Sequence, residues 1–239
     1  MKLYAYCLAD GIDMVEQPTL GISGASVWVW KTGNLSILVS DIDADSVPVT
    51  RDNALAHAAV VRSILSRTTP LPFRFGTIVT DEQLRSYVLA HRPALGTKLA
   101  ALRGCIEMSV KIIWASVQTD EATSSPNPAQ GPGATFLAEK RREIRGDETH
   151  AAQATEISTW LHEQVKDLIR HEQVTLRPTE KLVLAAAHLI ERTKIPQYRE
   201  KLIEVRQKRP ELHFLLSGPW PPYSFANIEL EFKTRFGVI

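Results

Sequence analysis

The chain contains 239 residues, of which 44% are hydrophobic and 23% are charged, the composition of an ordinary globular protein. Its 28 basic and 27 acidic side chains give a formal net charge of +1, so the overall charge does not favour nucleic acid or an anionic lipid surface as a partner. No run approaches the roughly 20 apolar residues of a membrane-spanning helix, and the length suits one large domain or two domains of roughly 100–150 residues.

The N-terminal apolar run, residues 3–8, alternates weakly and predicts a strand. It is too short for the apolar region of a signal peptide, so no targeting segment is expected there. The two cysteines, Cys7 and Cys105, each lie within an apolar run and are expected to be small buried hydrophobic residues. This cysteine usage fits a cytosolic location.

The next elements are a predicted hairpin and a helix. Residues 27–31 and 35–40 are apolar runs on either side of Gly33 and Asn34, which can adopt the positive φ of a tight turn. Between residues 52 and 66 the apolar side chains repeat at helical spacing. We expect the buried face of that helix to consist of Leu55, Ala58, Ala59, Val61, Ile64 and Leu65.

A short strand and a long helix are predicted for residues 70–104. Residues 70–79 indicate a strand whose two prolines favour an edge position or a strand start. Thr80 and Gln83 have the spacing of a capping box, which predicts that a helix begins there. Pro93 is expected to kink or split this helix because its ring clashes with the preceding turn, and Gly104 is expected to end it.

The middle of the chain combines a strand with a long helical segment. Residues 106–114 alternate, so Met108, Val110, Ile112 and Trp114 share one face of a predicted strand. Residues 118–133 are rich in Ser, Pro, Asn and Gly, and predict a flexible loop. A helix of about residues 134–173 follows, and its second half has an apolar stripe made of Ile157, Trp160, Leu161, Val165, Leu168 and Ile169.

The last part of the chain is predicted as strand, helix and strand. Residues 181–192 are ambiguous, because valine and leucine favour a buried strand whereas the alanines favour a helix, and we predict a strand. Pro196 suits the first turn of a helix that ends before Pro210. Residues 212–217 predict a further strand, and the tail, residues 226–239, alternates in part and can add an edge strand.

This order of elements lacks a regular βαβ rhythm and predicts an α+β fold of two domains. Residues 1–104 form the first predicted domain, and residues 105–239 form the second, which contains the long helical segment and the C-terminal tail. Each domain is expected to have a small, mainly antiparallel sheet with helices on one face, which is a ferredoxin-like character.

Residues 215–225, Leu-Leu-Ser-Gly-Pro-Trp-Pro-Pro-Tyr-Ser-Phe, are the most distinctive segment of the chain. The apolar run stops at Gly218, and three prolines then fix the backbone in a form that suits neither a helix nor an interior strand. Trp220 and Tyr223 are therefore expected to point in fixed directions. Such a turn either closes a hydrophobic core or presents its aromatic rings to a partner.

The sequence lacks the residue spacing typical of metal, nucleotide or nucleophile sites. The glycines before residue 134 lack the Gly-Lys-Ser/Thr ending of a phosphate loop, and the aspartates of residues 41–52 lack the glycine and glutamate of a calcium loop. The seven histidines form no His-x-x-x-His pair, and His57 and His188 are expected to be buried and hydrogen-bonded. No catalytic residue, cofactor or metal is therefore predicted.

Two groups of charged side chains leave alternatives open. Lys140, Arg141 and Arg142 lie among acidic residues at helical spacing, which indicates either a self-paired surface or a docking face for an acidic partner. Arg74 and Glu107 lie in otherwise apolar strands, and we expect a structural ion pair between strands there. The alternative is a polar site, which would make the chain a small-molecule- or nucleotide-binding α+β enzyme.

Several blocks spread over most of the chain carry a family resemblance. The most specific block is Gly-Pro-Trp-Pro-Pro-Tyr-Ser-Phe, from Gly218 to Phe225. Pro-Phe-Arg-Phe-Gly, from Pro72 to Gly76, is similar to a Pro-x-Arg-Phe-Gly strand of the same family. Supporting positions are Tyr4, Ala5, Tyr6, His57, Glu107, Val110, Lys111 and Trp114. Together these residues resemble the gas vesicle protein F/L family (GvpF/GvpL).

The resemblance implies a non-enzymatic accessory protein of gas vesicle formation that binds the hydrophobic shell protein and assists its assembly. It implies as partners the gas vesicle shell protein and other gas vesicle accessory proteins, with no nucleic acid and no lipid membrane. The implied locations are the gas vesicle, in association with its shell, and the cytoplasm. The candidate partner-binding or structural residues are Arg74, Phe75, Gly76, Lys140, Arg141, Arg142, Gly218, Trp220, Tyr223 and Phe225.

Overall fold

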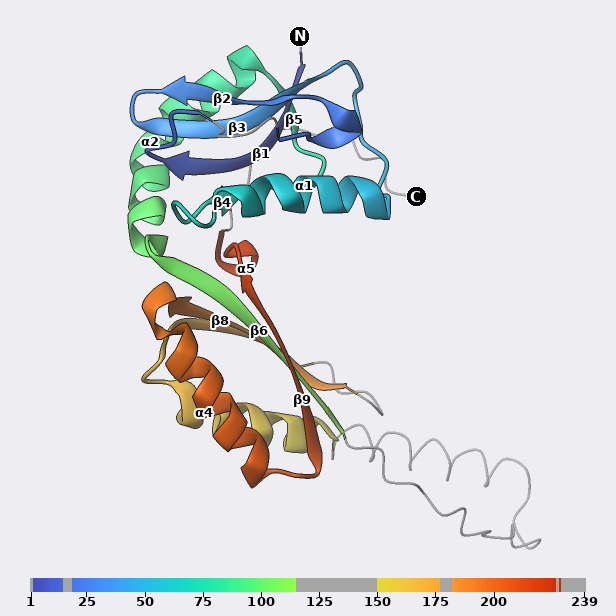
Figure 1. The fold of residues 1–239 in the computed structure, drawn as a ribbon, viewed down its shortest axis with the longest axis vertical. Coiled ribbons are helices and arrows are strands. Elements are labelled where there is room, and N and C mark those ends of the chain that lie inside the picture. The colour runs from blue at the N-terminus through green and yellow to red at the C-terminus, as the bar shows by residue number, and fades with distance from the viewer. Residues whose placement is uncertain (1, 15–18, 115–149, 177–181, 227, 229–239) are drawn as a thin grey trace, which may run out of the picture. The chain divides into compact units, whose positions relative to one another are not determined.

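The computed structural model describes residues 2–14, 19–114, 150–176, 182–226 and 228 (Figure 1). The contacts within the chain divide it into two compact units. The first unit consists of the residues up to Glu107 together with those from Pro219 onward, and the second is Met108–Gly218. This division assigns the C-terminal segment to the first unit, whereas the sequence division placed it in the second domain.

The sheet of the first unit has the strand order β2-β3-β1-β4, and β5 also pairs with β1. Its strands pair antiparallel, and they are β1 (Lys2–Asp10), β2 (Val27–Thr32), β3 (Leu35–Ile42), β4 (Leu71–Pro72) and β5 (Ile78–Thr80). The β2–β3 hairpin confirms the sequence prediction, and Gly33 in its turn has a φ of +60°. β1 lies between β3 and the short strands, and its residues from Leu3 to Ala9 are all buried.

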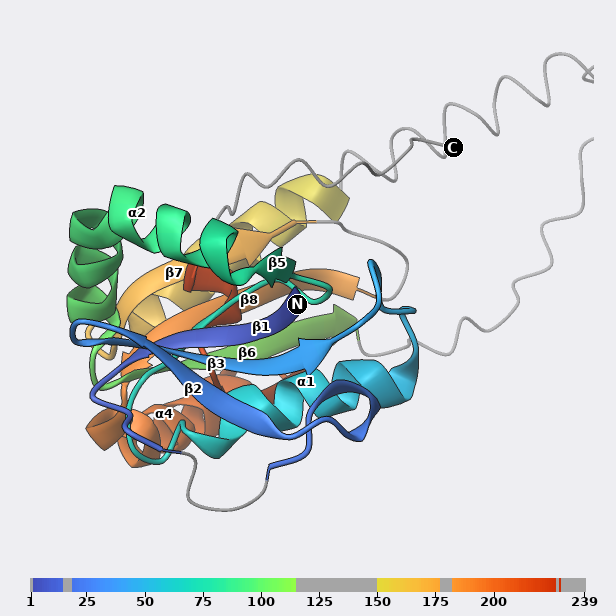
Figure 2. The same ribbon diagram turned by 90° about the horizontal axis from the view of Figure 1, so that it is seen from above.

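Helices α1 (Arg51–Ser63) and α2 (Asp81–Leu102) lie on opposite sides of β1 (Figures 1 and 2). Both faces of β1 are therefore covered, which differs from the placement of helices on one face expected from the sequence. The buried side of α1 carries His57, Val60 and Val61, and Leu55 is 56% exposed. The prediction that Leu55 and Ala59 belong to the buried face is wrong, because His57 turns inward to meet the tyrosines of β1.

The connection between α1 and α2 also differs from the prediction. The single strand predicted at residues 70–79 is two short strands, β4 and β5, because Gly76 lies between them with a φ of +82°. The capping box is confirmed: Thr80 Oγ1 accepts a hydrogen bond from the Gln83 nitrogen, and Gln83 Oε1 accepts one from the Thr80 nitrogen. The helix that begins there continues through Pro93 as one element, so Pro93 does not split it.

The second unit has the βαββαβ order of a ferredoxin-like fold. Its strands β6 (Cys105–Trp114), β7 (Ile169–Thr175), β8 (Leu182–Glu191) and β9 (Leu212–Trp220) form a sheet in the order β7-β8-β6-β9. A helix at residues 150–165 connects β6 to β7, and α4 (Ile195–Lys208) connects β8 to β9. This architecture confirms the α+β class, the choice of a strand for residues 181–192, and the helix that begins near Pro196.

The helix at residues 150–165 is shorter than predicted at its C-terminal end. It buries Ala154, Ile157, Leu161 and Val165, which confirms the apolar stripe in this part of the predicted helix. The helix prediction is wrong from Ile169 to Gln173, which lie in β7. The apolar spacing continues across a turn at residues 166–168, so it does not mark the change of structure. Residues 134–149 of the predicted helix lie outside the described residues.

The last strand is longer than predicted. β9 continues through Gly218 and Pro219 to Trp220, whereas the predicted strand ends at Ser217. Among the described strands β9 is the last in its sheet, and an edge strand tolerates a residue that cannot donate a backbone hydrogen bond. A short helix, α5 (Tyr223–Ala226), then follows directly after Pro222, where proline suits a helix start. The predicted tail strand lies mostly outside the described residues.

Candidate functional site

A buried tyrosine–histidine cluster joins β1, α1 and the β4–β5 connection. The Tyr4 hydroxyl lies 2.9 Å from His57 Nδ1 and accepts a hydrogen bond from the Gly76 nitrogen at 3.0 Å. The rings of Tyr4 and Phe75 meet edge to face, with their centroids 6.3 Å apart, and His57 contacts Phe75 in the same way. Residues from three distant parts of the chain therefore meet in one core.

The proton positions in this cluster follow from burial. Burial lowers the pKa of His57 from 6.5 to about 4 and raises the pKa of Tyr4 to about 12. Both side chains are therefore neutral near pH 7, so the Tyr4 hydroxyl donates to Nδ1 of His57. The second nitrogen of His57 is left for the hydrogen bond with the backbone of Phe73. His57 is thus the buried, hydrogen-bonded histidine that the sequence predicts.

A second buried tyrosine fixes the loop before β2. The Tyr6 hydroxyl lies 2.9 Å from Ser40 Oγ and accepts a hydrogen bond from the Ile22 nitrogen at 2.8 Å. A Cβ atom on Gly21 would collide with the Tyr6 hydroxyl oxygen and would lie 2.7 Å from its Cζ atom. Glycine is therefore required at this position by the tyrosine, although its φ of −96° is open to other residues.

The structure divides the predicted Arg74-Phe75-Gly76 motif. Phe75 and Gly76 belong to the buried cluster around Tyr4, whereas the Arg74 side chain is exposed. The expected ion pair between strands is wrong, because the Glu107 carboxylate is hydrogen-bonded to Ser224 instead. Motif residues that are adjacent in sequence thus point in different directions and meet different surroundings.

Residues 220–225, which carry three aromatic side chains, are attached to the rest of the first unit through Glu107. Glu107 is 7% exposed and accepts hydrogen bonds from the backbone nitrogen and the hydroxyl of Ser224, at 2.8 and 2.9 Å. Burial raises the pKa of Glu107, and the two hydrogen bonds oppose that rise. The carboxylate therefore anchors the start of α5 to the start of β6, within the first unit.

Trp220 and Tyr223 remain partly accessible in this segment. Trp220 is half-buried, and the guanidinium carbon of Arg62 lies 4.6 Å from the centroid of its ring. Tyr223 is 40% exposed, and Phe225 is half-buried. Gly218 belongs to the second unit, where its carbonyl oxygen lies 3.4 Å from Arg199 Nη2 and its φ is +122°. Trp220 and Tyr223 therefore lie in the first unit with part of each residue accessible, whereas Gly218 lies in the second unit beside Arg199.

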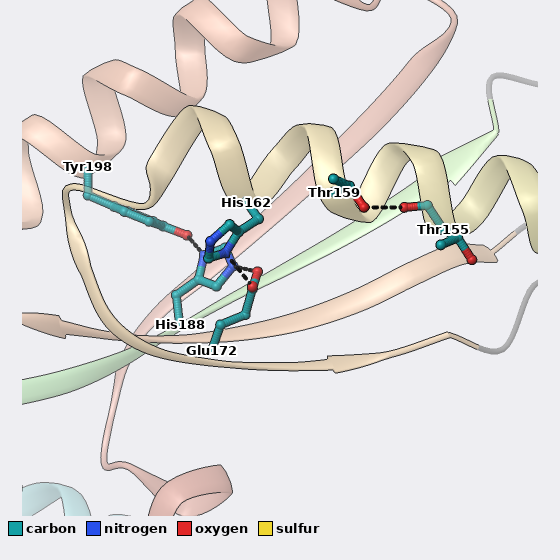
Figure 3. Close-up of polar contacts among 6 residues, drawn as sticks. All are labelled: Thr155, Thr159, His162, Glu172, His188 and Tyr198. Atoms are coloured by element: carbon teal, nitrogen blue, oxygen red, sulfur yellow. Dashed lines mark hydrogen bonds and ion pairs between the residues drawn. The ribbon is translucent and has the colours of Figure 1, made fainter.

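The second unit contains a polar network that joins four elements (Figure 3). The Glu172 carboxylate on β7 is hydrogen-bonded to two histidines. His188 Nε2, on β8, lies 2.9 Å from one carboxylate oxygen, and His162 Nδ1, on the helix at residues 150–165, lies 2.8 Å from the other. The other nitrogen of His188 lies 2.5 Å from the Tyr198 hydroxyl on α4. His188 and Tyr198 are completely buried.

The hydrogen-bond partners fix the direction of the protons in this network. The Glu172 carboxylate can only accept, so His188 Nε2 and His162 Nδ1 each donate to it. With a neutral His188 ring, Nδ1 is left to accept the Tyr198 proton. The hydrogen bond from His188 lowers the pKa of Glu172, against burial, which raises it. The network therefore holds one carboxylate in its charged form between two imidazoles.

The sequence predicts that His188 is buried but does not reveal its partners. The predicted helix includes Glu172, which lies in β7, and no pattern in the sequence connects it to His162 or Tyr198. A usable signal exists in the sequence: a histidine in the middle of a buried strand needs polar partners, and these come from the elements packed on that strand. The predicted cluster of Lys140, Arg141 and Arg142 lies outside the described residues.

In the ranges that the structure describes, no group of three His, Cys, Asp or Glu side chains is placed to hold a metal ion. The helices in those ranges do not include one that is long and apolar enough to span a membrane. His162 and His188 each direct a nitrogen at a different oxygen of Glu172.

Comparison with protein families and curated proteins gives consistent matches. The model of the family described as gas vesicle synthesis protein GvpL/GvpF matches residues 2–227. Gas vesicle protein F1 of Halobacterium salinarum is 26% identical over 241 residues, which cover 99% of this chain and 98% of that protein. Gas vesicle protein L2 of the same organism is 27% identical over 255 residues, which cover 93% and 90%.

Two solved structures share the fold. The crystal structure of the gas vesicle protein GvpF from an Anabaena species has a TM-score of 0.77, with 20% sequence identity over 95% of this chain and 98% of that chain. The crystal structure of GvpF from Microcystis aeruginosa has a TM-score of 0.74, with 20% identity over 95% and 99% of the two chains. At 20% sequence identity, these two comparisons show that the chains share a fold.

Proposed function

This chain belongs to the gas vesicle synthesis protein GvpL/GvpF family, and from that premise we propose that it binds the hydrophobic shell protein of gas vesicles and assists its assembly. The observation that carries the proposal is the extent of the match. It covers residues 2–227 and therefore includes elements of both compact units. The relatives named above are matched over at least 90% of their own length.

We propose that this role is accessory and not enzymatic. The polar clusters that most resemble catalytic groups support a structural task. His57 is 4% exposed and His188 is completely buried, and each has hydrogen-bond partners on other elements of its unit. Groups held in this way stabilise the packing of strands and helices. A β-rich, apolar client would need its open strand edges covered, which an α+β protein can do by strand addition or through a helix-binding surface.

The proposed partners are the shell protein and other gas vesicle accessory proteins, and the proposed locations are the vesicle shell and the cytoplasm. The family match and its curated relatives, which are named gas vesicle proteins, support both. Washed, floated vesicles distinguish a lasting shell component, which stays with the vesicles, from a transient assistant, which is found only in the unbound pool.

Co-purification with the shell protein tests the proposal. The shell protein and this chain are expressed together, with an affinity tag first on one and then on the other, and the untagged partner is quantified in the eluate. Association in both orientations is expected, and its absence in both overturns the proposal. A thermal-shift screen addresses the enzyme alternative, because a small molecule or nucleotide that raises the melting temperature at stoichiometric concentration would favour it.

A further inference from the structure

Three side chains of the first unit gather at one surface position, which we call the arginine–aromatic patch: Arg62, Trp220 and Tyr223. Arg62 is an exposed residue in the last turn of α1, and its guanidinium carbon lies 4.6 Å from the centroid of the Trp220 ring. Tyr223 follows Trp220 by three residues and begins α5. The guanidinium thus lies over the first of the two aromatic side chains that this short segment carries.

The aromatic side of the patch is held in place before any partner arrives. Ser224 is fixed to Glu107 by two hydrogen bonds, and Pro221 and Pro222 are buried. Prolines and anchored backbone leave little conformational freedom to lose on binding. Tyr223 nevertheless stays 40% exposed as a residue, so the segment keeps part of this aromatic residue accessible on a rigid base.

The two chain segments that form the patch carry charges of one sign. Residues 53–80, which include the end of α1 and the connection that follows, contain three arginines and no aspartate or glutamate. Residues 212–228 contain no lysine, arginine, aspartate or glutamate. The carboxylate of Glu107 is 7% exposed and already accepts two hydrogen bonds. Among the residues that the structure describes, none pairs with the Arg62 guanidinium through a carboxylate or a carbonyl oxygen.

We propose that this patch binds an acidic segment of a protein partner, with a carboxylate on Arg62 and an adjacent apolar side chain against Trp220 and Tyr223. The planar guanidinium can stack on a ring with its face and bind a carboxylate through its N–H edge at the same time. Tryptophan, tyrosine and arginine are also the residue types that carry most of the energy in protein interfaces. The inference rests on the proposed function, which makes the shell protein the occupant.

The co-purification assay with tagged shell protein tests this surface in the full-length chain. Arg62→Met keeps an unbranched stem over the Trp220 ring but removes the charge, and Tyr223→Ala removes the exposed ring. Each is expected to lower the amount bound by about tenfold or more, as loss of a central contact does in other interfaces. Arg85→Met is the matched control, because Arg85 lies 5.4 Å from the Trp30 ring centroid elsewhere in the same unit. It should bind as the unchanged protein does.

The outcomes separate this inference from the proposed function. If the unchanged protein binds the shell protein and Arg62→Met binds equally well, the patch is not the contact, and the proposed function stands. If the unchanged protein does not bind the shell protein, the result overturns both the proposed function and the proposed role of the patch. Binding that weakens with added salt in the unchanged protein, and is weak and salt-insensitive in Arg62→Met, supports a carboxylate on Arg62. Thermal melting of each variant establishes that a loss of binding is not a loss of folding.

Discussion

Ser224 donates two hydrogen bonds to the carboxylate of Glu107, one from its backbone nitrogen and one from its hydroxyl, although 117 residues separate the two in the sequence. The contact anchors the short helix α5 in the first unit. Because Glu107 is 7% exposed, its charge depends on these two donors in place of water. The segment that carries the aromatic rings is therefore held by a pair of polar side chains as well as by its prolines.

Substitution of Glu107 should release this anchor. We expect Glu107→Gln to lower the free energy of unfolding by about 1–3 kcal/mol, because the amide cannot accept both hydrogen bonds. Ser224→Ala should cost about 1 kcal/mol, because only the hydroxyl bond is lost. Urea unfolding followed by tryptophan fluorescence measures both. Glu200→Gln, at an exposed position on α4, is the control and should change stability by less than about 0.5 kcal/mol.

The buried His57 should make stability depend on pH. The unfolded chain gains a proton on this residue as the pH falls below 6.5, whereas the folded chain keeps His57 neutral down to about 4. Protons then favour the unfolded state, so stability is lost as the pH falls from about 6.5 to about 4. A shift of this size corresponds to about 3 kcal/mol.

Urea unfolding at a series of pH values measures this loss. His57→Asn provides the comparison, because its amide oxygen can accept the Tyr4 hydroxyl proton but does not titrate. The variant should lose much less stability over the same pH range. An equal slope for both proteins would mean that another group causes the dependence.

Local signals in the sequence were sufficient for elements whose structure is decided locally. The glycine and asparagine at residues 33 and 34 predicted the hairpin, and the spacing of Thr80 and Gln83 predicted the start of α2. Both features depend on atoms within a few residues of each other. The ferredoxin-like order of the second unit followed from the sequence of strands and helices once residues 181–192 were assigned to a strand.

Features decided by distant contacts could not be predicted in the same way. β9 runs through Pro219 because it lies at the edge of the described sheet, which no local pattern reveals. The inward turn of His57 depends on Tyr4, which lies 53 residues away. Glu107 was expected to meet an arginine, and its partner is Ser224 on a segment at the other end of the chain. Charge and polarity predicted that these groups need partners, but not which partners.

The Glu172 network should stabilise the second unit in a pH-dependent manner. The hydrogen bond from His188 lowers the pKa of Glu172 below its ordinary value of 4.5, so the unfolded chain takes up this proton first as the pH falls. The stability that the carboxylate contributes is therefore fully present above about pH 4.5 and is lost below it, toward the folded pKa. This loss lies at lower pH than most of the loss expected from His57.

Substitutions of Glu172 and of Tyr198 test how much the network contributes to stability. Glu172→Gln should lower the free energy of unfolding by about 1–3 kcal/mol at pH 7 and should lack the loss below pH 4.5. Tyr198→Phe should cost a similar amount, about 1–3 kcal/mol, because it leaves His188 Nδ1 buried without its donor. Thr159→Val, on the exposed side of the neighbouring helix, is the control for a polar substitution. If Tyr198→Phe were neutral, the hydroxyl would not be part of the network.

Gly21 should tolerate no side chain while the Tyr6 hydroxyl is present. A Cβ at this position would overlap the hydroxyl oxygen that accepts the Ile22 hydrogen bond, so Gly21→Ala should cost about 1–3 kcal/mol. Tyr6→Phe alone should cost about 1–2 kcal/mol through its lost hydrogen bonds. In the double variant the closest contact is gone, so the combined loss should be smaller than the sum by about 0.5 kcal/mol or more.

Gly96 is the control position for Gly21, because an added methyl group has free space there. Gly96 lies inside α2, and a Cβ there would have no atom within 4 Å, so Gly96→Ala should raise stability by about 0.5–1 kcal/mol. The opposite signs at two glycines separate a steric requirement from a general effect of adding a methyl group. Urea unfolding of the four variants and the unchanged protein gives all the energies. Strict additivity of Gly21→Ala and Tyr6→Phe would show that the tyrosine does not impose glycine at this position.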